Sequence, residues 1–146
     1  LKTINGKIHS VGRLDYNSQG LLLLTNNTKI KSYLESPSNK ITRIYKVKIQ
    51  GIIDHKIIRK IEEGLIIKKV KYRVRNIKII STSGSYTWLL IKLDEGKNNH
   101  IRKIFKRLGF SVNKLIRIQY GTIKLSSLKP GNLRFLSPFK LNLIDL

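Results

Sequence analysis

The sequence contains no cysteine, so disulfide bonds and metal sites built on thiolates are excluded. Its three histidines, His9, His55 and His100, are far apart and lack a metal-ligand spacing such as HxxxH. We therefore expect no bound metal ion. No apolar run approaches the roughly 18 residues that a membrane-spanning helix needs. We also expect no signal peptide, because Lys2 and Lys7 are not followed by an apolar block.

Acidic residues are scarce as well. Eight Asp and Glu stand against 30 Lys and Arg, which gives a formal net charge of +22. A charge of this size favours a phosphate-rich partner, because bound cations release the counterions that surround a nucleic acid. An AT-rich coding sequence can enrich lysine, but by itself it does not remove acids this thoroughly. An anionic membrane surface is the weaker alternative, because the sequence shows no long amphipathic helix with a bulky aromatic face.

Hydrophobic residues make up 40% of the 146 residues, which excludes a disordered chain and fits one domain with a substantial core. Apolar periodicity predicts helices over residues 28–35, 54–63 and 97–108. It predicts strands over residues 21–25, 43–50, 86–93, 111–119, 122–125 and 133–136, with a turn at 81–85. Residues 65–80 are strand-like, with a charged crossing at Lys68-Lys69 and another near Arg75-Asn76. Strands dominate, so we predict an α+β fold with a mixed, mainly antiparallel sheet and a few flanking helices.

One carboxylate occupies an unusual position in this basic sequence. Asp15 lies in a turn between Arg13 and a run of four leucines, and residues 1–53 contain only one other acid, Glu35. A single carboxylate beside an arginine is a candidate for chemistry on a nucleic acid. Taken alone, the more ordinary interpretation is that Asp15 stabilises its turn and that Arg13 anchors a phosphate.

Several segments, taken in order, resemble a known family. The resemblance rests on Gly12-Arg13-Leu14-Asp15 followed by Ser18, Gly20, the leucine run and Thr25-Asn26; on Tyr45-Lys46-Val47; on Glu95-Gly96-Lys97-Asn98 with residues 101–105; and on residues 112–121 and 128–131. Together they are similar to the motifs and closing strands of the RsuA/RluB-type ribosomal RNA pseudouridine synthases. The resemblance covers nearly the whole chain.

The resemblance implies an RNA isomerase that converts a uridine to pseudouridine without a cofactor. It makes Asp15 the essential carboxylate, acting on the ribose as a nucleophile or as a base at C2′, and the sequence leaves both roles open. Tyr45 would stack on the flipped uracil. Arg102 would reach Asp15, keep it ionised and orient it. A solvated helix surface for Arg102 and plain strand packing for Tyr45 are the alternatives.

The same resemblance implies contacts to the substrate RNA. Arg13 would hold the RNA or fill the space that the flipped base leaves, with a structural ion pair as the alternative. Leu93 would help to wall the uracil pocket, or it is a core leucine. The remaining predicted RNA-binding residues lie on the third helix or just before it, where solvated surface is the alternative: Lys97, His100 and Lys103. Asn99-His100 departs from the family pattern, which leaves the contact of His100 open.

Full-length members of that family carry a small N-terminal S4 domain and a first strand before the Gly12 motif. We therefore expect residues 1–146 to be a catalytic domain that lacks both. The expected partner is ribosomal RNA or a pre-ribosomal particle, bound by a monomer in a bacterial cytoplasm or in an organelle with an AT-rich genome. Residues 115–121 resemble the large-subunit branch more than the small-subunit one. The alternatives are a noncatalytic RNA-binding assembly factor on the same fold and a basic structural ribosomal protein.

Overall fold

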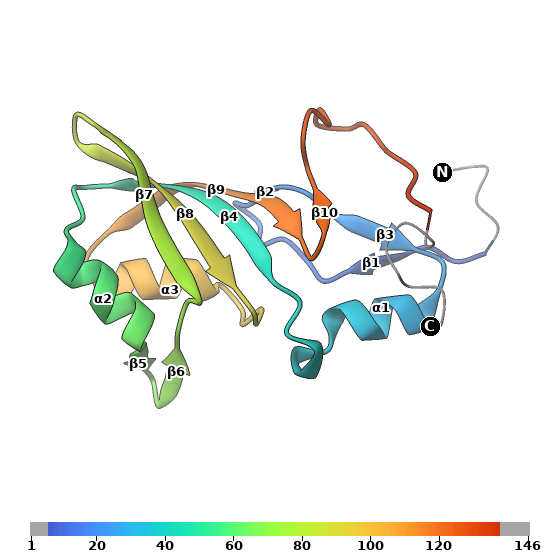
Figure 1. The fold of residues 1–146 in the computed structure, drawn as a ribbon, viewed down its shortest axis with the longest axis horizontal. Helices are drawn as coiled ribbons and strands as arrows, with labels where there is room; N and C mark the ends of the chain where they lie inside the picture. The colour runs from blue at the N-terminus through green and yellow to red at the C-terminus, as the bar shows by residue number, and fades with distance from the viewer. Residues whose placement is uncertain (1–5, 138–146) are drawn as a thin grey trace.

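The computed structural model describes residues 6–137 of the chain (Figure 1). Its helices are α1 (Thr28–Glu35), α2 (His55–Glu63) and α3 (His100–Arg107), with a short 3-10 helix η1 at Pro37–Asn39. Its strands are β1 (His9–Val11), β2 (Gln19–Gly20), β3 (Leu23–Thr25), β4 (Arg43–Gln50), β5 (Leu65–Ile67), β6 (Val70–Tyr72), β7 (Asn76–Ser83), β8 (Tyr86–Leu93), β9 (Ser111–Tyr120) and β10 (Ile123–Lys124).

A six-stranded sheet forms the centre of the molecule. Five of its strands follow the order β10-β9-β4-β8-β7, and β2 pairs with β9. The β2–β9 pair is parallel, and the other pairs in this sheet are antiparallel. Strands β4 and β9 run through both halves of the molecule (Figure 1). The predicted α+β class with a mixed, mainly antiparallel sheet is confirmed.

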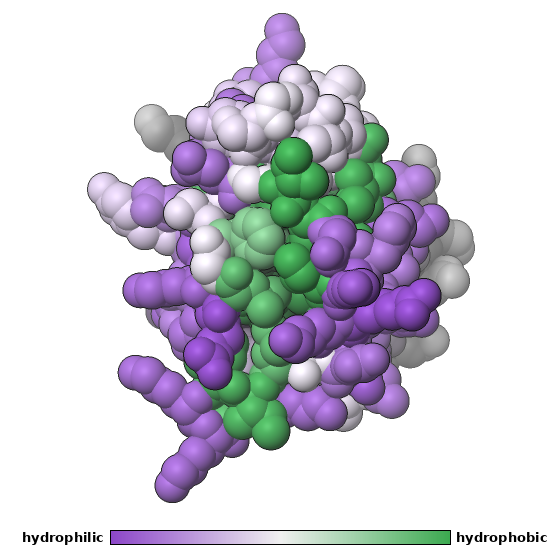
Figure 2. Space-filling view, turned by 90° about the vertical axis from the view of Figure 1, so that its left-hand side faces the viewer, coloured by the Kyte–Doolittle hydropathy of each residue, from purple (hydrophilic) through white to green (hydrophobic). Residues whose placement is uncertain are grey.

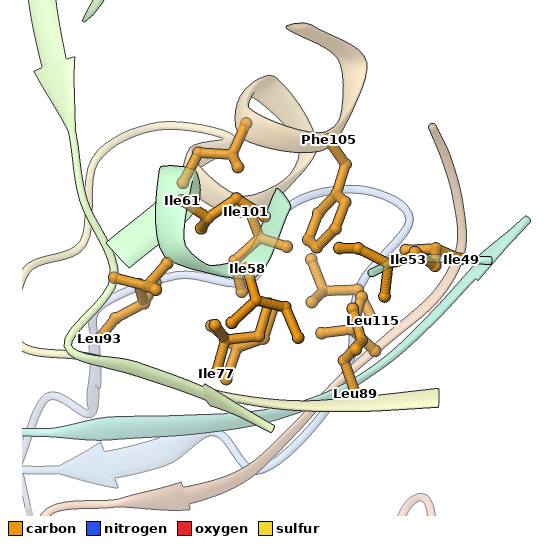
Figure 3. Packing of buried hydrophobic residues seen from close by; sticks show 14 of the residues in the cluster. Ile49, Ile53, Ile58, Ile61, Ile77, Leu89, Leu93, Ile101, Phe105 and Leu115 are labelled. Atoms are coloured by element: carbon orange, nitrogen blue, oxygen red, sulfur yellow. The ribbon is translucent and has the colours of Figure 1, made fainter. Parts of the chain in front are cut away.

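Helices α2 and α3 lie on the same side of one half of this sheet (Figure 1). Their apolar residues meet the inward-facing residues of the strands in one hydrophobic cluster (Figure 3). Burial of each such Ile, Leu or Phe contributes about 1.5–3 kcal/mol to folding. The members that are at most 1% exposed are Val47, Ile49, Ile61, Leu89, Ile91, Ile104 and Phe105.

A second, smaller cluster fills the other half of the molecule. Here α1 packs against the two-stranded β1–β3 sheet (Figure 1). Asn27 begins α1, because its side-chain oxygen accepts from the backbone N–H of Lys29 at 2.9 Å and of Ile30 at 3.2 Å. Strand β9 gives Leu115 to the first cluster and Tyr120 to the second, so it connects the two halves.

Several predicted elements are confirmed with their bounds. The structure places a helix at residues 28–35 and strands at residues 43–50 and 86–93, as predicted. Asp54 accepts from the backbone N–H of Ile57 at 2.8 Å and so caps α2, which ends at Glu63. These segments carry both a clear apolar period and a clear start or stop, which is why the sequence suffices for them.

Other predicted elements are wrong or incomplete. Residues 133–136 form no strand. The strand-like segment 65–80 is divided into β5, β6 and the first part of β7. The chain reverses at Lys68 and Lys69, which both have positive φ, and is interrupted again at residues 73–75, close to the two charged crossings noted in the sequence. Strand β7 continues through Ser83, so the turn at 81–85 begins too early. The third helix begins at His100, since Asn99 is in the left-handed conformation, with φ at 50°. The short strands β1 and β2 were not predicted. Strand β1 lies directly before Gly12, where the sequence was expected to lack a strand.

The leucine run differs from the buried strand that was predicted. Only its second half lies in a strand, β3, and its side chains alternate between core and surface. Leu21 and Leu23 are buried, whereas Leu22 and Leu24 are 42% and 41% exposed. A two-stranded sheet buries only one face, which explains this alternation.

At the end of the molecule that carries α2 and the tips of β7 and β8, hydrophobic side chains form a band on the surface between hydrophilic ones (Figure 2). Among residues 6–137, no helix is long and apolar enough to cross a membrane.

Candidate active site

A cavity of about 270 Å³ opens where the two hydrophobic clusters meet. Its volume is near the lower end of the range for small-molecule sites, about 300–1,000 Å³. Six of the eight predicted site residues line it: Arg13, Asp15, Tyr45, Leu93, Lys97 and His100. The cavity thus brings together residues from the Asp15 turn, β4, β8 and the start of α3.

The turn that carries Asp15 is fixed by backbone hydrogen bonds. Gly12 donates its N–H to Glu35 Oε1 on α1 at 2.7 Å, and Ser18 donates its N–H to the Asp15 carbonyl at 2.8 Å. At the far end of the turn, Leu21 N–H donates to the Arg117 carbonyl at 2.8 Å. Asp15 itself is half-buried, and within residues 6–137 its carboxylate has no hydrogen bond or ion pair. The Asp15 carboxylate therefore lines the cavity without a protein partner among the described residues.

Glu35 stays ionised beside this turn. Burial alone would raise the pKa of its carboxyl, but hydrogen bonds from the Lys31 ammonium and the Gly12 N–H outweigh that effect. The positive charges of Lys31 and Arg43 act in the same direction, so the pKa of Glu35 is lowered from its ordinary value. The cavity wall therefore contains one carboxylate with a structural role, Glu35, and one that has no protein partner among residues 6–137, Asp15.

Tyr45 faces the cavity because side chains alternate along β4, whose register with β8 is unbroken. The register between β4 and β9 shifts between Ile44, opposite Gln119, and Tyr45, opposite Arg117, so Ile118 is an extra residue in β9. This bulge brings Arg117 to the same side of the sheet as Tyr120. Leu93, at the end of β8 and opposite Arg43, is 2% exposed and also lines the cavity.

Two buried arginines also line the cavity, and the sequence analysis did not single them out. Arg117 is 3% exposed. Its Nε donates to the Leu21 carbonyl at 2.7 Å and its Nη1 to the Arg13 carbonyl at 3.4 Å. Arg117 therefore holds both ends of the Asp15 turn. Its buried Nη2 has no hydrogen-bond partner within the part of the chain that the structure describes.

Arg43 is the second buried arginine, at 6% exposed. Its Nη2 donates to the hydroxyl of Tyr120 at 2.8 Å and to the Leu34 carbonyl at 3.2 Å, and its Nη1 donates to the Asp94 carbonyl at 3.2 Å. The guanidinium carbons of Arg43 and Arg117 lie 4.8 Å and 5.2 Å from the centre of the Tyr120 ring. Cation–π contacts and carbonyl oxygens thus stabilise two buried positive charges.

Lys97, in the loop before α3, and His100, the first residue of α3, line the cavity, but both have protein partners. The Lys97 ammonium donates to the Lys71 carbonyl at 2.9 Å and pairs with Glu95 at 2.5 Å. His100 is 4% exposed, and its Nε2 lies 3.1 Å from the Arg73 carbonyl. Burial lowers the pKa of His100 to about 4, so the ring is neutral at pH 7. The contact of His100 with RNA stays a prediction.

Arg102 and Lys103 do not line this cavity. Arg102 donates from Nη2 to the Asn17 carbonyl at 2.6 Å and from Nη1 to the Val112 carbonyl at 3.0 Å. It contacts the Asp15 turn through Asn17, and no ion pair joins it to Asp15 among the described residues. Lys103 donates to the hydroxyl of Tyr72 at 3.2 Å. Direct pairing of Arg102 with Asp15 therefore remains a prediction.

The positions of the buried arginines could be found from strand alternation. Leu115 and Arg117 are two residues apart on β9, so they face the same side of the sheet. The same argument places Arg43 on the side of Tyr45 and Val47. Within residues 6–137, no three His, Cys, Asp or Glu side chains gather as metal ligands would.

Comparison with known proteins points to one family. A family model described as RNA pseudouridylate synthase matches residues 2–107. An "uncharacterized RNA pseudouridine synthase" of Rickettsia prowazekii is 42% identical over 131 residues, which is 90% of this chain and 55% of the relative. The ribosomal large subunit pseudouridine synthase B of Bacillus subtilis is 34% identical over 139 residues, which is 94% of this chain and 57% of the relative. The chain thus spans about half the length of these relatives.

Solved structures agree with this result. A crystal structure of a pseudouridylate synthase superposes with a TM-score of 0.82 at 27% identity, covering 93% of this chain and 59% of the other. A structure of an H/ACA RNP bound to a substrate RNA has a TM-score of 0.63 at 19% identity, over 81% of this chain and 40% of the other, and shows the shared fold alone. The matched family model, the relatives and the fold together show that the chain belongs to the RNA pseudouridylate synthase family.

Proposed function

We propose that this chain isomerises a uridine to pseudouridine in ribosomal RNA, with Asp15 as its catalytic carboxylate. The observation that carries the proposal is the convergence of Asp15, Tyr45 and Leu93 on one cavity, from three separate segments of the sequence. The cavity is basic, because Arg43 and Arg117 are buried in its wall. A site of this kind suits one nucleoside of a phosphate-rich chain.

The proposed reaction breaks the N1–C1′ bond of the uridine and forms a C5–C1′ bond to the same uracil. The proton on C5 leaves, and N1 gains one, so the reaction consumes no co-substrate. Asp15 attacks the electron-poor ribose or removes the C2′ proton, in the manner of carboxylates in glycoside chemistry. Because the target uridine is inside folded RNA, it leaves the base stack before it enters the cavity, where Tyr45 offers its ring as a platform.

The proposed substrate is large-subunit ribosomal RNA, free or in a pre-ribosomal particle. The name of the Bacillus subtilis relative supports the large subunit. The relatives compared above come from bacteria, which favours a bacterial cytoplasm over an organelle as the site of the reaction. We further propose that residues 1–146 are the catalytic domain of the enzyme and that it acts as a monomer without a cofactor.

The experiment that tests the proposal measures tritium release from ribosomal RNA labelled at uridine C5. The parent chain is compared with Asp15→Asn, which keeps the size of the side chain and removes its charge. We expect the variant to lose roughly 10²–10⁴-fold or more in rate, the range for a positioned acid or base. The matched control is Asp54→Asn, since Asn caps a helix as well as Asp does and position 54 is exposed. Full turnover by Asp15→Asn would overturn the proposed mechanism.

A noncatalytic RNA-binding assembly factor is the second candidate. The observation in its favour is that Arg102 donates to Asn17 and Val112 rather than to Asp15. This candidate predicts no tritium release from the parent chain or from Asp15→Asn, together with salt-sensitive RNA binding by both. Release by the parent chain alone would exclude it.

A further inference from the structure

The main sheet has one face that no helix covers. Cross-strand partners point to the same side of a sheet, so the register defines this face, here named the open face. On it, Lys46 lies opposite Leu90 and Ile116, and Lys48 lies opposite Trp88 and Lys114. The open face includes Ile44, Lys46 and Lys48 on β4, Tyr86, Trp88, Leu90 and Lys92 on β8, Lys78 on β7, and Lys114 and Ile116 on β9, with uncharged polar residues beside them.

The opposite face of the same strands is the one that builds the core and the cavity. Val47, Leu89 and Leu115 are at most 4% exposed there, under α2 and α3. Both helices lie on that side of the sheet in Figure 1, and within residues 6–137 no helix packs on the open face. The open face is therefore a broad surface without a partner in the described part of the chain.

The charge of the open face has one sign. It carries five lysines, at positions 46, 48, 78, 92 and 114, drawn from four strands. Strands β4, β7, β8 and β9 contain no Asp or Glu at all. Lysines on adjacent strands repel each other, as Lys48 and Lys114 do, so a polyanion that bridges them relieves this repulsion.

Two aromatic rings lie among these lysines. The Lys46 ammonium lies 4.8 Å from the centre of the Trp88 ring, and the Lys48 ammonium lies 4.1 Å from the centre of the Tyr86 ring. Tyr86 and Trp88 are two residues apart, hence roughly 7 Å apart along β8, and both are half-buried. Each ring therefore has a lysine ammonium at its face. When an RNA base stacks on the ring and displaces the ammonium, the ammonium can bind a phosphate instead.

We propose that the open face binds single-stranded RNA, with bases stacked on Trp88 and Tyr86 and phosphates held by the surrounding lysines. Aromatic platforms within a basic groove are how proteins bind single strands without reading their sequence. An apolar partner fits less well, because the lysines separate the apolar residues of this face. The proposal goes beyond the proposed function, since the cavity lies on the other side of the sheet. The open face can bind RNA whether or not a uridine reacts in the cavity.

Trp88 is the only tryptophan in the sequence, so tryptophan fluorescence reports on the open face alone. The experiment titrates the chain with a short oligouridylate and follows both Trp88 fluorescence and the anisotropy of a dye on the RNA. We expect Trp88 emission to be quenched along the same binding curve as the anisotropy. We also expect Asp15→Asn to be quenched like the parent, since Asp15 is not on the open face.

The test variant is the triple substitution Lys48→Gln, Lys78→Gln and Lys114→Gln. These positions are on the open face, and none of them lines the cavity. Loss of three phosphate contacts lowers the slope of log affinity against log salt by about 2, since each contact to a single strand contributes about 0.7. We expect RNA affinity at low salt to fall by about tenfold or more.

The matched control removes the same charge elsewhere, through Lys56→Gln, Lys60→Gln and Lys106→Gln. These lysines are exposed on α2 and α3, on the helix-covered side of the molecule. The control is expected to keep the parental salt slope and the quenching of Trp88. Circular dichroism of both triple variants verifies that each is folded.

Three results would overturn the proposal. The first is RNA binding by anisotropy without any change in Trp88 emission. The second is an equal loss of affinity in the two triple variants. The third is a shift of Trp88 emission with anionic phosphatidylglycerol vesicles but not with RNA, which would assign the face to a lipid surface. Tritium release is measured in parallel, so the proposed function and the open face can fail independently.

Discussion

The guanidinium of Arg43 donates a 2.8 Å hydrogen bond to the hydroxyl of Tyr120, and the two side chains are 6% and 1% exposed. The same hydroxyl donates to the Leu34 carbonyl on α1 at 2.9 Å. One oxygen atom thus connects β4, β9 and α1 at the wall of the cavity. Buried polar groups of this kind are costly when a partner is removed.

We expect Tyr120→Phe to destabilise the protein by about 1–3 kcal/mol, because it leaves Arg43 and the Leu34 carbonyl short of a partner. The measurement is the free energy of unfolding in urea. Tyr33→Phe removes the same atom from a side chain that is 37% exposed on α1, and we expect a change of less than about 0.5 kcal/mol. Equal changes in both variants would show that the Arg43–Tyr120 bond contributes nothing.

Gly20 is the position where the Asp15 turn approaches β9 most closely. Its φ is +103°, and a Cβ built there would lie 2.3 Å from the Arg117 carbonyl oxygen. We expect Gly20→Ala to cost at least about 2 kcal/mol more than Gly109→Ala. Gly109 also has a positive φ, +82°, but open space around it, so the control isolates the steric contact from the backbone strain. Thermal unfolding of the two variants measures the difference.

Separation of Gly20 from β9 by the added methyl group also affects the turn that carries Asp15. The β2–β9 pair places Gly20 beside Arg117, whose side chain holds the carbonyls of Arg13 and Leu21. We expect Gly20→Ala to lower the rate of tritium release even at temperatures where the variant is fully folded. A rate equal to that of the parent would show that the Asp15 turn tolerates a shift of β2.

Much of the fold follows from short-range signals in the sequence. Alternation along residues 43–50 predicts β4, although it is imperfect around Tyr45, and Asp54 with Gly64 brackets α2. The strand predicted over residues 133–136 is wrong, since a short apolar run is compatible with any element and no partner strand pairs with it in the described chain. The start of α3 was missed because Asn99 takes a left-handed conformation that periodicity does not report.

The site was predicted less completely than the fold. Resemblance supplied Asp15 and Tyr45, and the cavity unites them. The buried arginines were overlooked because charged residues are ordinarily assigned to the surface, although strand alternation places Arg117 beside Leu115. The partners of Arg102 could not be predicted, since they are backbone carbonyls whose positions depend on tertiary structure.

His100 makes stability depend on pH. Its pKa is about 4 in the folded chain, chiefly because of burial, against an ordinary value of 6.5. As the pH falls from 6.5 toward 4, the unfolded chain binds a proton that the folded chain does not, so stability decreases; below about 4 both bind it and the loss is complete. The full effect is on the order of 3 kcal/mol.

We expect His100→Gln to remove most of this decrease, since glutamine donates to the Arg73 carbonyl without binding a proton. The measurement is the free energy of unfolding between pH 5 and pH 6.5, a window above the one in which carboxylates such as Glu35 titrate. The parent should lose stability across this window, and the variant should stay nearly constant. Identical slopes would show that His100 gains its proton in the folded state as readily as in the unfolded state.

Substitutions at Arg102 distinguish two ways in which its guanidinium supports Asp15: by its positive charge or by its shape. In the structure the guanidinium bridges the carbonyls of Asn17 and Val112, which ties the Asp15 turn to the start of β9. Lysine keeps the charge but is a point donor that cannot span both carbonyls. If the bridge matters, Arg102→Lys should lower the rate of tritium release nearly as much as Arg102→Met does, and each should lose about 1–2 kcal/mol of stability. Rescue by lysine, with activity near the parent and well above Arg102→Met, would instead mean that the positive charge acts on Asp15 directly, as the family resemblance implies.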